Sequence, residues 1–262
     1  MQSSQSHASQ PSRRKVAKAF GLKAACYEQF ALFQNETIVH LIACYGNQIK
    51  NGQVWVDLGC GTGLFSKNLR EHHQNASLIG LDISPESLKF SSRSTRYSIL
   101  ADIEAIPFKK DSIDGFVVAS VIQWVADFKR CLHDLHECLN KKGAVLFSVF
   151  TDKSFYELNT VKRTFDLTVP VTLPSEDSFL TILNQCEFSV SHYDTLEHTY
   201  FFPTAIDALK SMSGYGATAA TDSTLTKNKI KELCVEYERQ FKCDKGVPVT
   251  YKAITGIAIK ES

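Results

Sequence analysis

Apolar and polar residues follow one another along the chain in a way that separates short strands from amphipathic helices. From residue 16 to residue 44, apolar side chains recur every three or four positions, which predicts two helices before the first strand. Five strand-like segments then alternate with connections, most of which have helical spacing: residues 53–58, 77–81, 97–100, 115–120 and 144–150. This order predicts an α/β fold, a mostly parallel sheet with right-handed crossovers and helices on both faces.

The rhythm is looser in the last part of the chain. Helical spacing returns in four segments that we expect to cover the open end of the sheet: residues 154–165, 175–185, 204–213 and 226–241. The final segment, from Val247 to Ile259, alternates apolar and other residues with the period of two that is typical of a strand. We expect this segment to join the same sheet.

Length and composition suit one folded domain. The chain has 262 residues, of which 44% are hydrophobic, and single hydrophobic cores stop growing near about 250 to 300 residues. We therefore expect residues 13–262 to form a single domain, with a helical insertion at about 203–245. Residues 1–12 are rich in Ser and Gln and lack the apolar run of a secretory signal, which predicts a disordered tail.

Charge and cysteine spacing narrow the classes of partner. The formal net charge of +1 gives no global field for nucleic acid or an anionic membrane, and no stretch approaches the ~18 apolar residues that span a bilayer. We expect neither partner. The eight cysteines include no CxxC pair, and the histidines do not cluster at metal-ligand spacing. We therefore expect no metal site and a cytoplasmic protein with reduced thiols.

The first predicted strand ends in Asp57, and glycines follow at positions 59, 61 and 63. Glycine permits positive φ and close approach of a ligand to the backbone. In the dinucleotide-binding pattern G-x-G-x-x-G the third glycine would come one residue later, and a carboxylate suits a pyrophosphate poorly. Because a carboxylate can hold the cationic amino end of a methionine-bearing ligand, the turn favours a sulfonium cofactor. The alternative is a turn that only reverses the chain.

Two more acidic residues follow later strands. Asp82, at the end of the second strand, is placed to accept hydrogen bonds from both hydroxyls of a ribose, although Asp82 or Ser84 could instead only cap the next helix. Asp102 follows the third strand, where its carboxylate could accept from an adenine amino group while the amide of Ile103 donates to the ring. The three acidic strand ends thus match three parts of one nucleoside.

These motifs resemble those of the class I methyltransferases over residues 54–150. The resemblance implies S-adenosylmethionine as the cofactor and a Rossmann-like, mostly parallel seven-stranded sheet whose last strand is antiparallel. It also implies a set of cofactor-binding residues: Asp57, Leu58, Gly59, Cys60, Gly61, Gly63, Asp82, Ile83, Asp102, Ile103 and Ser120.

A finer resemblance rests on four segments: residues 19–31, 119–124, 213–218 and 248–256. They resemble the malonyl-acyl-carrier-protein O-methyltransferases of biotin synthesis. This implies methyl transfer to the free carboxylate of malonyl-acyl-carrier protein or malonyl-CoA, under a lid formed by helices within residues 13–50. It implies a catalytic set: Tyr27, Gln123, Trp124 and Lys210. The sequence departs from the family pattern in its basic residues, since Lys210 stands where an arginine is usual and offers a point charge instead of a bidentate fork.

The implied reaction requires little acid–base chemistry. A malonyl carboxylate is ionised at pH 7, so it can attack the sulfonium methyl group without a general base. A carrier protein is typically acidic, which makes Lys227, Lys229 and Lys231 candidates for a docking patch. Two alternatives remain open: a methyltransferase for another small acceptor such as a quinone precursor, with His192 or His198 as the base, or a non-catalytic partner protein of the same fold.

Overall fold

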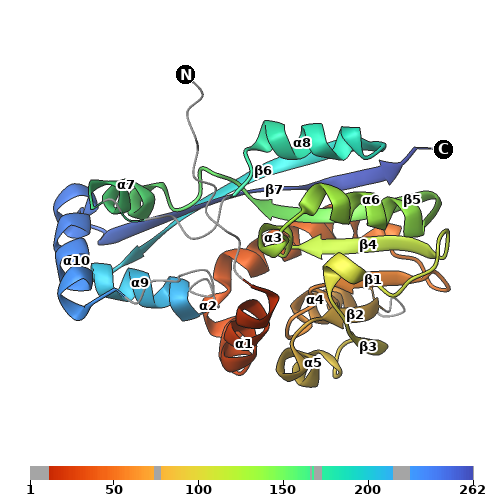
Figure 1. Ribbon diagram of the computed structural model, residues 1–262, viewed down its shortest axis with the longest axis horizontal. Coiled ribbons are helices and arrows are strands. Elements are labelled where there is room, and N and C mark those ends of the chain that lie inside the picture. Colours follow the sequence, from red (N-terminus) through yellow and green to blue (C-terminus); the bar gives the residue numbers. More distant parts are fainter. Residues whose placement is uncertain (1–11, 74–77, 166, 168–172, 215–224, 262) are drawn as a thin grey trace.

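The computed structural model describes residues 12–73, 78–165, 167, 173–214 and 225–261. Its centre is one seven-stranded sheet with the strand order β3-β2-β1-β4-β5-β7-β6 (Figure 1). The strands are β1 (Trp55–Leu58), β2 (Leu78–Asp82), β3 (Tyr97–Leu100), β4 (Ile113–Ala119), β5 (Leu139–Phe150), β6 (Phe188–Phe202) and β7 (Val247–Lys260). The predicted tail falls almost entirely outside the described residues.

The first five strands run parallel, and β7 is antiparallel to both of its neighbours, β5 and β6. The strand order reverses at β1, which pairs with β2 on one side and with β4 on the other. Such a switch point leaves a crevice at the carboxyl ends of the strands, where ligands bind in open α/β sheets. The predicted fold class, including the antiparallel last strand, is confirmed.

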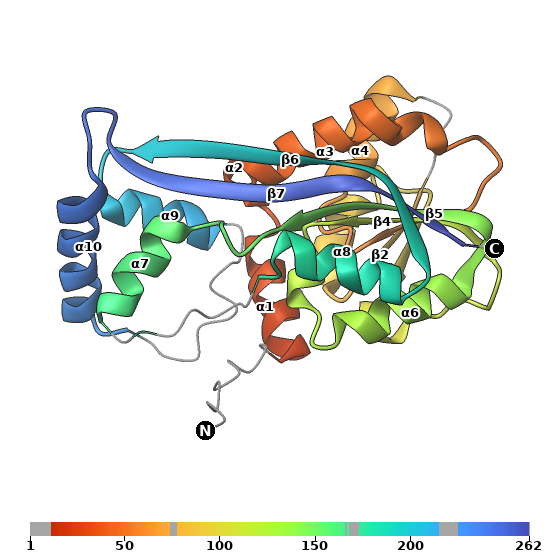
Figure 2. The ribbon, with the colours of Figure 1, turned by 90° about the horizontal axis from the view of Figure 1, so that it is seen from above.

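Helices cover both faces of this sheet. On one face α3 (Leu32–Tyr45) and α4 (Leu64–His72) pack against the strands, and on the other α6 (Phe128–Cys138) and α8 (Glu176–Gln185) do so (Figure 2). Each face has its own hydrophobic cluster, and buried apolar area of this kind is the dominant favourable term in folding. The remaining helices near the sheet are α1 (Arg13–Lys23), α2 (Tyr27–Phe30) and α5 (Pro85–Ser91).

Strands β6 and β7 continue beyond the end of β5. The segment Val247–Lys252 pairs with β6 alone, because β5 ends opposite Ala253. Helices α7 (Tyr156–Thr164), α9 (Ala205–Gly214) and α10 (Lys227–Phe241) gather around this two-stranded arm (Figure 2). A third hydrophobic cluster lies between the helices and the arm.

The sequence located most elements. The two helices predicted before β1 are three, because the chain turns at residues 24–26 and again at Ala31. Strand β6 was not located, since it is an edge strand whose side chains are mostly exposed or half-buried and its apolar alternation is weak. Within the described ranges, the helices are all too short or too polar to cross a bilayer.

Candidate functional site

A pocket opens at the carboxyl ends of β1, β2 and β4, where the strand order reverses. It encloses about 870 Å³, a volume that includes open solvent at its mouth. Its floor is the turn after β1, its sides follow β2, β3 and β4, and α1 and α2 cover it. Nine of the residues that the sequence singled out line it: Tyr27, Gly59, Gly61, Asp82, Ile83, Asp102, Ile103, Ser120 and Trp124.

The glycines of the floor are required by the backbone. Gly59, Gly61 and Gly63 have φ values of 63°, 54° and 84°, in the left-handed region that side chains disfavour. A Cβ atom on Gly59 would lie 2.3 Å from Val121 Cγ2, whereas one on Gly61 would meet only a backbone oxygen at 4.0 Å. Gly61 therefore leaves open space in the pocket that a side chain would fill.

Asp57 lies beneath this floor and is 2% exposed. Its Oδ2 atom is buried and accepts no hydrogen bond from any described residue. Burial, and then the nearby charge of Asp82, raise the pKa of Asp57 to about 8. Burying a carboxylate oxygen without a hydrogen bond raises the free energy of the folded chain. A ligand that donates a hydrogen bond to this oxygen, preferably a cationic one, would remove that cost.

Asp82 forms the polar wall beside it. One carboxylate oxygen accepts from the amide of Gly61 at 2.8 Å and the other from the amide of Ser84 at 2.8 Å. Burial raises the pKa of Asp82, and these amides oppose the shift. Ser84 caps α5 through its own side chain, which accepts from Ser87. Each Asp82 oxygen therefore keeps a second lone pair for a ligand hydroxyl while the amides hold the carboxylate in place.

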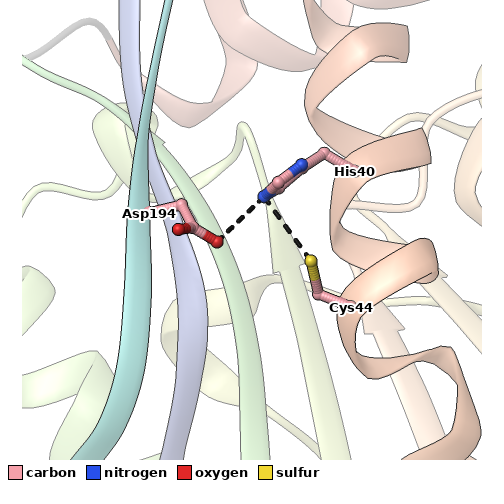
Figure 3. Close-up of side chains that lie close together, drawn as sticks. All are labelled: His40, Cys44 and Asp194. Atoms are coloured by element: carbon pink, nitrogen blue, oxygen red, sulfur yellow. Dashed lines mark hydrogen bonds and ion pairs between the residues drawn. The ribbon is translucent and has the colours of Figure 1, made fainter.

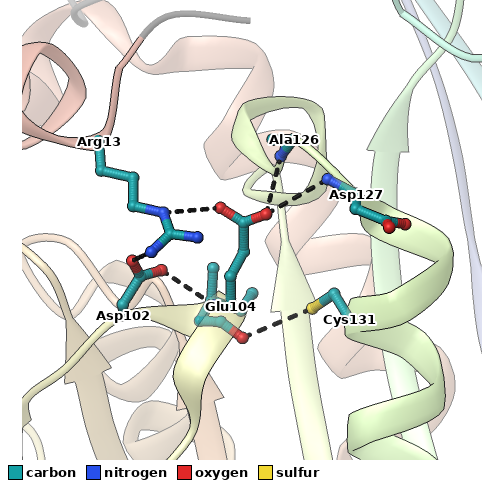
Figure 4. A network of polar contacts seen from close by, with 7 residues as sticks. Arg13, Asp102, Glu104, Ala126, Asp127 and Cys131 are labelled. Carbon is teal, nitrogen blue, oxygen red and sulfur yellow. Dashed lines mark hydrogen bonds and ion pairs between the residues drawn. The ribbon is translucent and has the colours of Figure 1, made fainter.

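Asp102 and Glu104 follow β3 and bind the start of α1. Arg13 contacts Asp102 Oδ2 and Glu104 Oε2, each at 3.0 Å (Figure 4). The second oxygen of Glu104 accepts from the amides of Ala126 and Asp127 at 3.2 Å. Because Arg13 is 58% exposed, each ion pair contributes about 1 kcal/mol or less. The network ties the covering helix to the pocket wall.

Aromatic side chains close the pocket from the side of α1. Phe20 lies edge-on to Trp124, with ring centroids 5.2 Å apart, and 6.4 Å from Tyr27. Burial, together with the charges of Asp82, Glu28 and Asp57, raises the pKa of Tyr27 well above its usual value. Tyr27 is therefore a neutral hydroxyl over an acidic pocket.

Ser120 and Gln123 mark the junction after β4. Ser120 adopts a positive φ of 56°, which is uncommon for a residue with a side chain, and its hydroxyl oxygen is buried with no described partner. Gln123 donates to the carbonyl of Ser120 at 3.0 Å, while its Oε1 atom is likewise buried and unpaired. Gln123 does not itself line the pocket but supports the residue that does.

A methyltransferase domain family matches residues 56–147, the segment that carries the glycine turn and the acidic strand ends. Residues 56–147 therefore form a methyltransferase domain, and the chain has the class I methyltransferase fold. Its relatives include malonyl-[acyl-carrier protein] O-methyltransferases from Pectobacterium atrosepticum and Erwinia billingiae. They are 26% and 29% identical, each over 95% of this chain, and the match covers 97% and 98% of their own lengths. The fold is also that of a putative methyltransferase from Bacillus halodurans, with a TM-score of 0.62 at 15% identity, covering 86% of this chain and 99% of that one.

Besides Asp57 and Gln123, four more residues of the expected set lie outside the pocket. Leu58 is fully buried in the sheet core, and the Cys60 side chain packs towards Gly80. Gly63 precedes α4, where a Cβ would meet Ser94 Oγ at 2.3 Å. Lys210 lies on α9, is 69% exposed and pairs with Asp207 at 3.6 Å. Leu58, Cys60 and Gly63 support the turn on the side away from the pocket. Lys210 is not among the residues that line the pocket.

The lid expected within residues 13–50 was given without the α1 residues that face the pocket. Arg13, Val16, Phe20 and Ala24 all line the pocket. Their spacing of three and four residues places them on one side of a helix, and this spacing was visible in the sequence. The pattern indicated a buried face, but it could not indicate that the face covers a ligand site and not a hydrophobic core.

Proposed function

We propose that this methyltransferase uses S-adenosylmethionine to methylate the free carboxylate of a malonyl thioester carried by acyl-carrier protein or coenzyme A. The methyl ester would then serve as a fatty-acyl-like primer for the pimelate part of biotin, and the enzyme would act in the cytoplasm. Support for the acceptor comes from the relatives, whose similarity extends over the covering helices and the arm as well as the cofactor half.

One observation carries the cofactor part of the proposal: Asp57, near the end of β1 and directly before the glycine turn, has a buried Oδ2 atom without a described partner. The amino group of S-adenosylmethionine is a cation that suits this oxygen, and Asp82 and Asp102 follow as acceptors for ribose hydroxyls and the adenine amino group. When bound, the cofactor supplies an electrophilic methyl group on a sulfonium. Asp57, Asp82 and Asp102 are then proposed to hold its three parts.

The residues on the acceptor side act by placement. A carboxylate acceptor carries no proton at neutral pH, so no side chain has to remove one. Tyr27, Phe20 and Trp124 form an apolar wall that excludes water from the attacking oxygen. Holding two reactants in near-attack geometry supplies about 7 to 11 kcal/mol of the barrier. We propose that Tyr27 and Trp124 provide this positioning and that Gln123 steadies the Ser120 turn.

Docking of a carrier protein requires a surface beyond the pocket. The first turns of α10 carry Lys227, Lys229 and Lys231. Lys229 lies 4.7 Å from the ring centroid of Phe165 and 3.7 Å from Glu232. We propose that this group, called the α10 lysine patch, attracts the acidic surface of a carrier protein.

The positions of two histidines favour a carboxylate acceptor over a carbon or phenol acceptor. An acceptor that must lose a proton needs a base within about 3 Å of it. His192 contacts Asp194, and His198 contacts Glu36 at 3.0 Å. Neither histidine lines the pocket, so neither is placed to act as that base.

The test is an assay of labelled methyl transfer from S-adenosylmethionine to malonyl-acyl-carrier protein, malonyl-CoA and free malonate. We expect transfer to one or both thioesters and little to free malonate. Methylation of none of the three, by protein that binds S-adenosylhomocysteine, would refute the acceptor while leaving the cofactor intact. Absence of S-adenosylhomocysteine binding would refute the cofactor as well.

A further inference from the structure

Three potential metal ligands converge between α3 and the edge strand β6. His40 Nε2 lies 3.0 Å from Asp194 Oδ2 and 3.6 Å from Cys44 Sγ, and all three ligand atoms lie within 4.8 Å of one another. Figure 3 shows that both contacts of His40 are made by the same ring nitrogen. The cluster joins residues from two elements that are 150 or more positions apart in the chain.

The geometry differs from that of a catalytic triad. In a cysteine–histidine–carboxylate triad, one ring nitrogen faces the thiol and the other faces the carboxylate, so that the carboxylate orients a base. Here the thiol and the carboxylate compete for Nε2 of His40. Three ligand atoms that face one point are instead the arrangement expected around a shared cation.

The ligand types and their spacing fit zinc. Zn²⁺ binds cysteine sulfur at about 2.3 Å, and histidine nitrogen and aspartate oxygen at about 2.0 to 2.2 Å. Around a tetrahedral ion these bond lengths place neighbouring ligand atoms about 3.3 to 3.6 Å apart. The two separations that involve His40, 3.0 Å and 3.6 Å, are close to this range, and the ligand atoms of Cys44 and Asp194 lie within 4.8 Å of each other.

We propose that His40, Cys44 and Asp194 form a three-ligand site for a divalent transition ion, with Zn²⁺ the best match. A further donor is His192, whose Nε2 atom lies 3.5 Å from the second oxygen of Asp194. It holds that carboxylate from the other side, as outer partners of metal ligands commonly do. Of the three ligands, Cys44 is exposed, and His40 and Asp194 are half-buried.

The site is separate from methyl transfer. None of its residues lines the pocket at the carboxyl ends of β1, β2 and β4. Bound zinc would tie α3 to the edge strand β6 and stabilise the folded chain by linkage, since the unfolded chain does not bring the three ligands together. Zinc binding at this site therefore does not depend on the proposed methyl transfer.

The sequence signal for this site was weak. His40 and Cys44 are four residues apart, which places them on one face of a helix. The third ligand comes from a strand that the sequence did not locate. For that reason spacing alone predicted no metal site.

The experiment is calorimetric titration of Zn²⁺ into the untagged full chain after treatment with a chelator. We expect one Zn²⁺ per chain with micromolar or tighter affinity, and a melting temperature raised by about 5 to 10 °C at 100-fold excess over Kd. Co²⁺ in place of Zn²⁺ should give a thiolate-to-cobalt charge-transfer band, which reports directly on sulfur ligation.

The matched variants are Cys44→Ser and Cys243→Ser, since both thiols are exposed and free. Cys44→Ser should abolish the charge-transfer band and weaken zinc binding by at least about 10-fold, as should His40→Ala. Cys243→Ser should change neither. Because the two mutated thiols are exposed, both serine variants are expected to melt like the unaltered chain without metal. Absence of a Zn²⁺ or Co²⁺ complex, or equal binding by Cys44→Ser, would overturn the proposal.

Discussion

Two fully buried carboxylates, one in the cofactor half of the sheet and one in the arm, differ in whether their oxygens are paired. Asp57 at the end of β1 has a buried oxygen without a described partner. Glu157 on α7 is 0% exposed, and its two oxygens accept from the amide and the hydroxyl of Thr250. A satisfied buried carboxylate stabilises the fold, whereas an unsatisfied one has capacity for a ligand. We therefore expect Asp57 to bind a ligand and Glu157 to stabilise the fold of the arm.

The largest expected effect comes from neutralising each carboxylate in turn. Asp57→Asn should weaken binding of S-adenosylhomocysteine by about 100-fold, since it removes a buried charge-assisted contact worth about 2 to 3 kcal/mol. Glu157→Gln should leave cofactor affinity within about twofold but destabilise the fold by about 1 to 3 kcal/mol. Calorimetry measures the first quantity and urea unfolding the second. Equal loss of affinity for S-adenosylhomocysteine in both variants would show that the two carboxylates do not differ in this way.

A smaller effect is expected at Gly61, whose Cβ position is open to the pocket. Gly61→Ala should weaken S-adenosylhomocysteine binding by about 10-fold through steric overlap with the ligand, because an added Cβ meets no protein atom closer than 4.0 Å.

The matched control is Gly52, which has a φ of 86° and nothing within 4 Å of an added Cβ. Both alanine variants should lose about 1 kcal/mol of stability from left-handed backbone strain, but Gly52→Ala should bind the ligand normally. Normal binding of S-adenosylhomocysteine by Gly61→Ala would show that the glycine turn does not contact the cofactor.

In the arm, the α10 lysine patch should affect the acceptor alone. Replacing Lys227, Lys229 and Lys231 by Glu should lower kcat/KM for malonyl-acyl-carrier protein by several-fold at low salt, and less at high salt because ions screen the attraction. Cofactor affinity should not change. The exposed pair Lys109 and Lys141, replaced by Glu, is the control. An unaltered kcat/KM of the patch variant for malonyl-acyl-carrier protein at low salt would refute docking at these lysines.

The smallest expected effect is a pH dependence of stability in the cofactor-free protein. The folded-state pKa of Asp57, about 8, exceeds its ordinary value of 3.8, so the folded chain holds this proton more tightly than the unfolded chain. Stability from this group is therefore highest below about pH 4 and falls as the pH rises to about 8. Melting curves should show the Asp57→Asn variant gaining on the unaltered chain by a few degrees between pH 7 and 8. A difference in melting temperature between the two proteins that does not change with pH would contradict a raised pKa of Asp57 in the folded chain.

The sequence predicted the cofactor half better than the arm for a physical reason. Positive φ at Gly59 and Gly61 and a carboxylate at each strand end are local requirements that leave a residue-level pattern. The covering face of α1, the edge strand β6 and the contact of Asp194 with α3 depend on which segments meet in space. Lys210 shows the same limit, since a charge on a predicted helix face gave no sign that it would pair with Asp207.

Methyl transfer to the free carboxylate of a malonyl thioester is best tested by mass spectrometry of malonyl-acyl-carrier protein after incubation with the enzyme and S-adenosylmethionine. We expect one added methyl group, present as a base-labile ester at the malonyl carboxylate. It should be absent when Asp57→Asn replaces the unaltered enzyme at limiting cofactor. A methyl group on the malonyl carbon or on the carrier protein itself would contradict it.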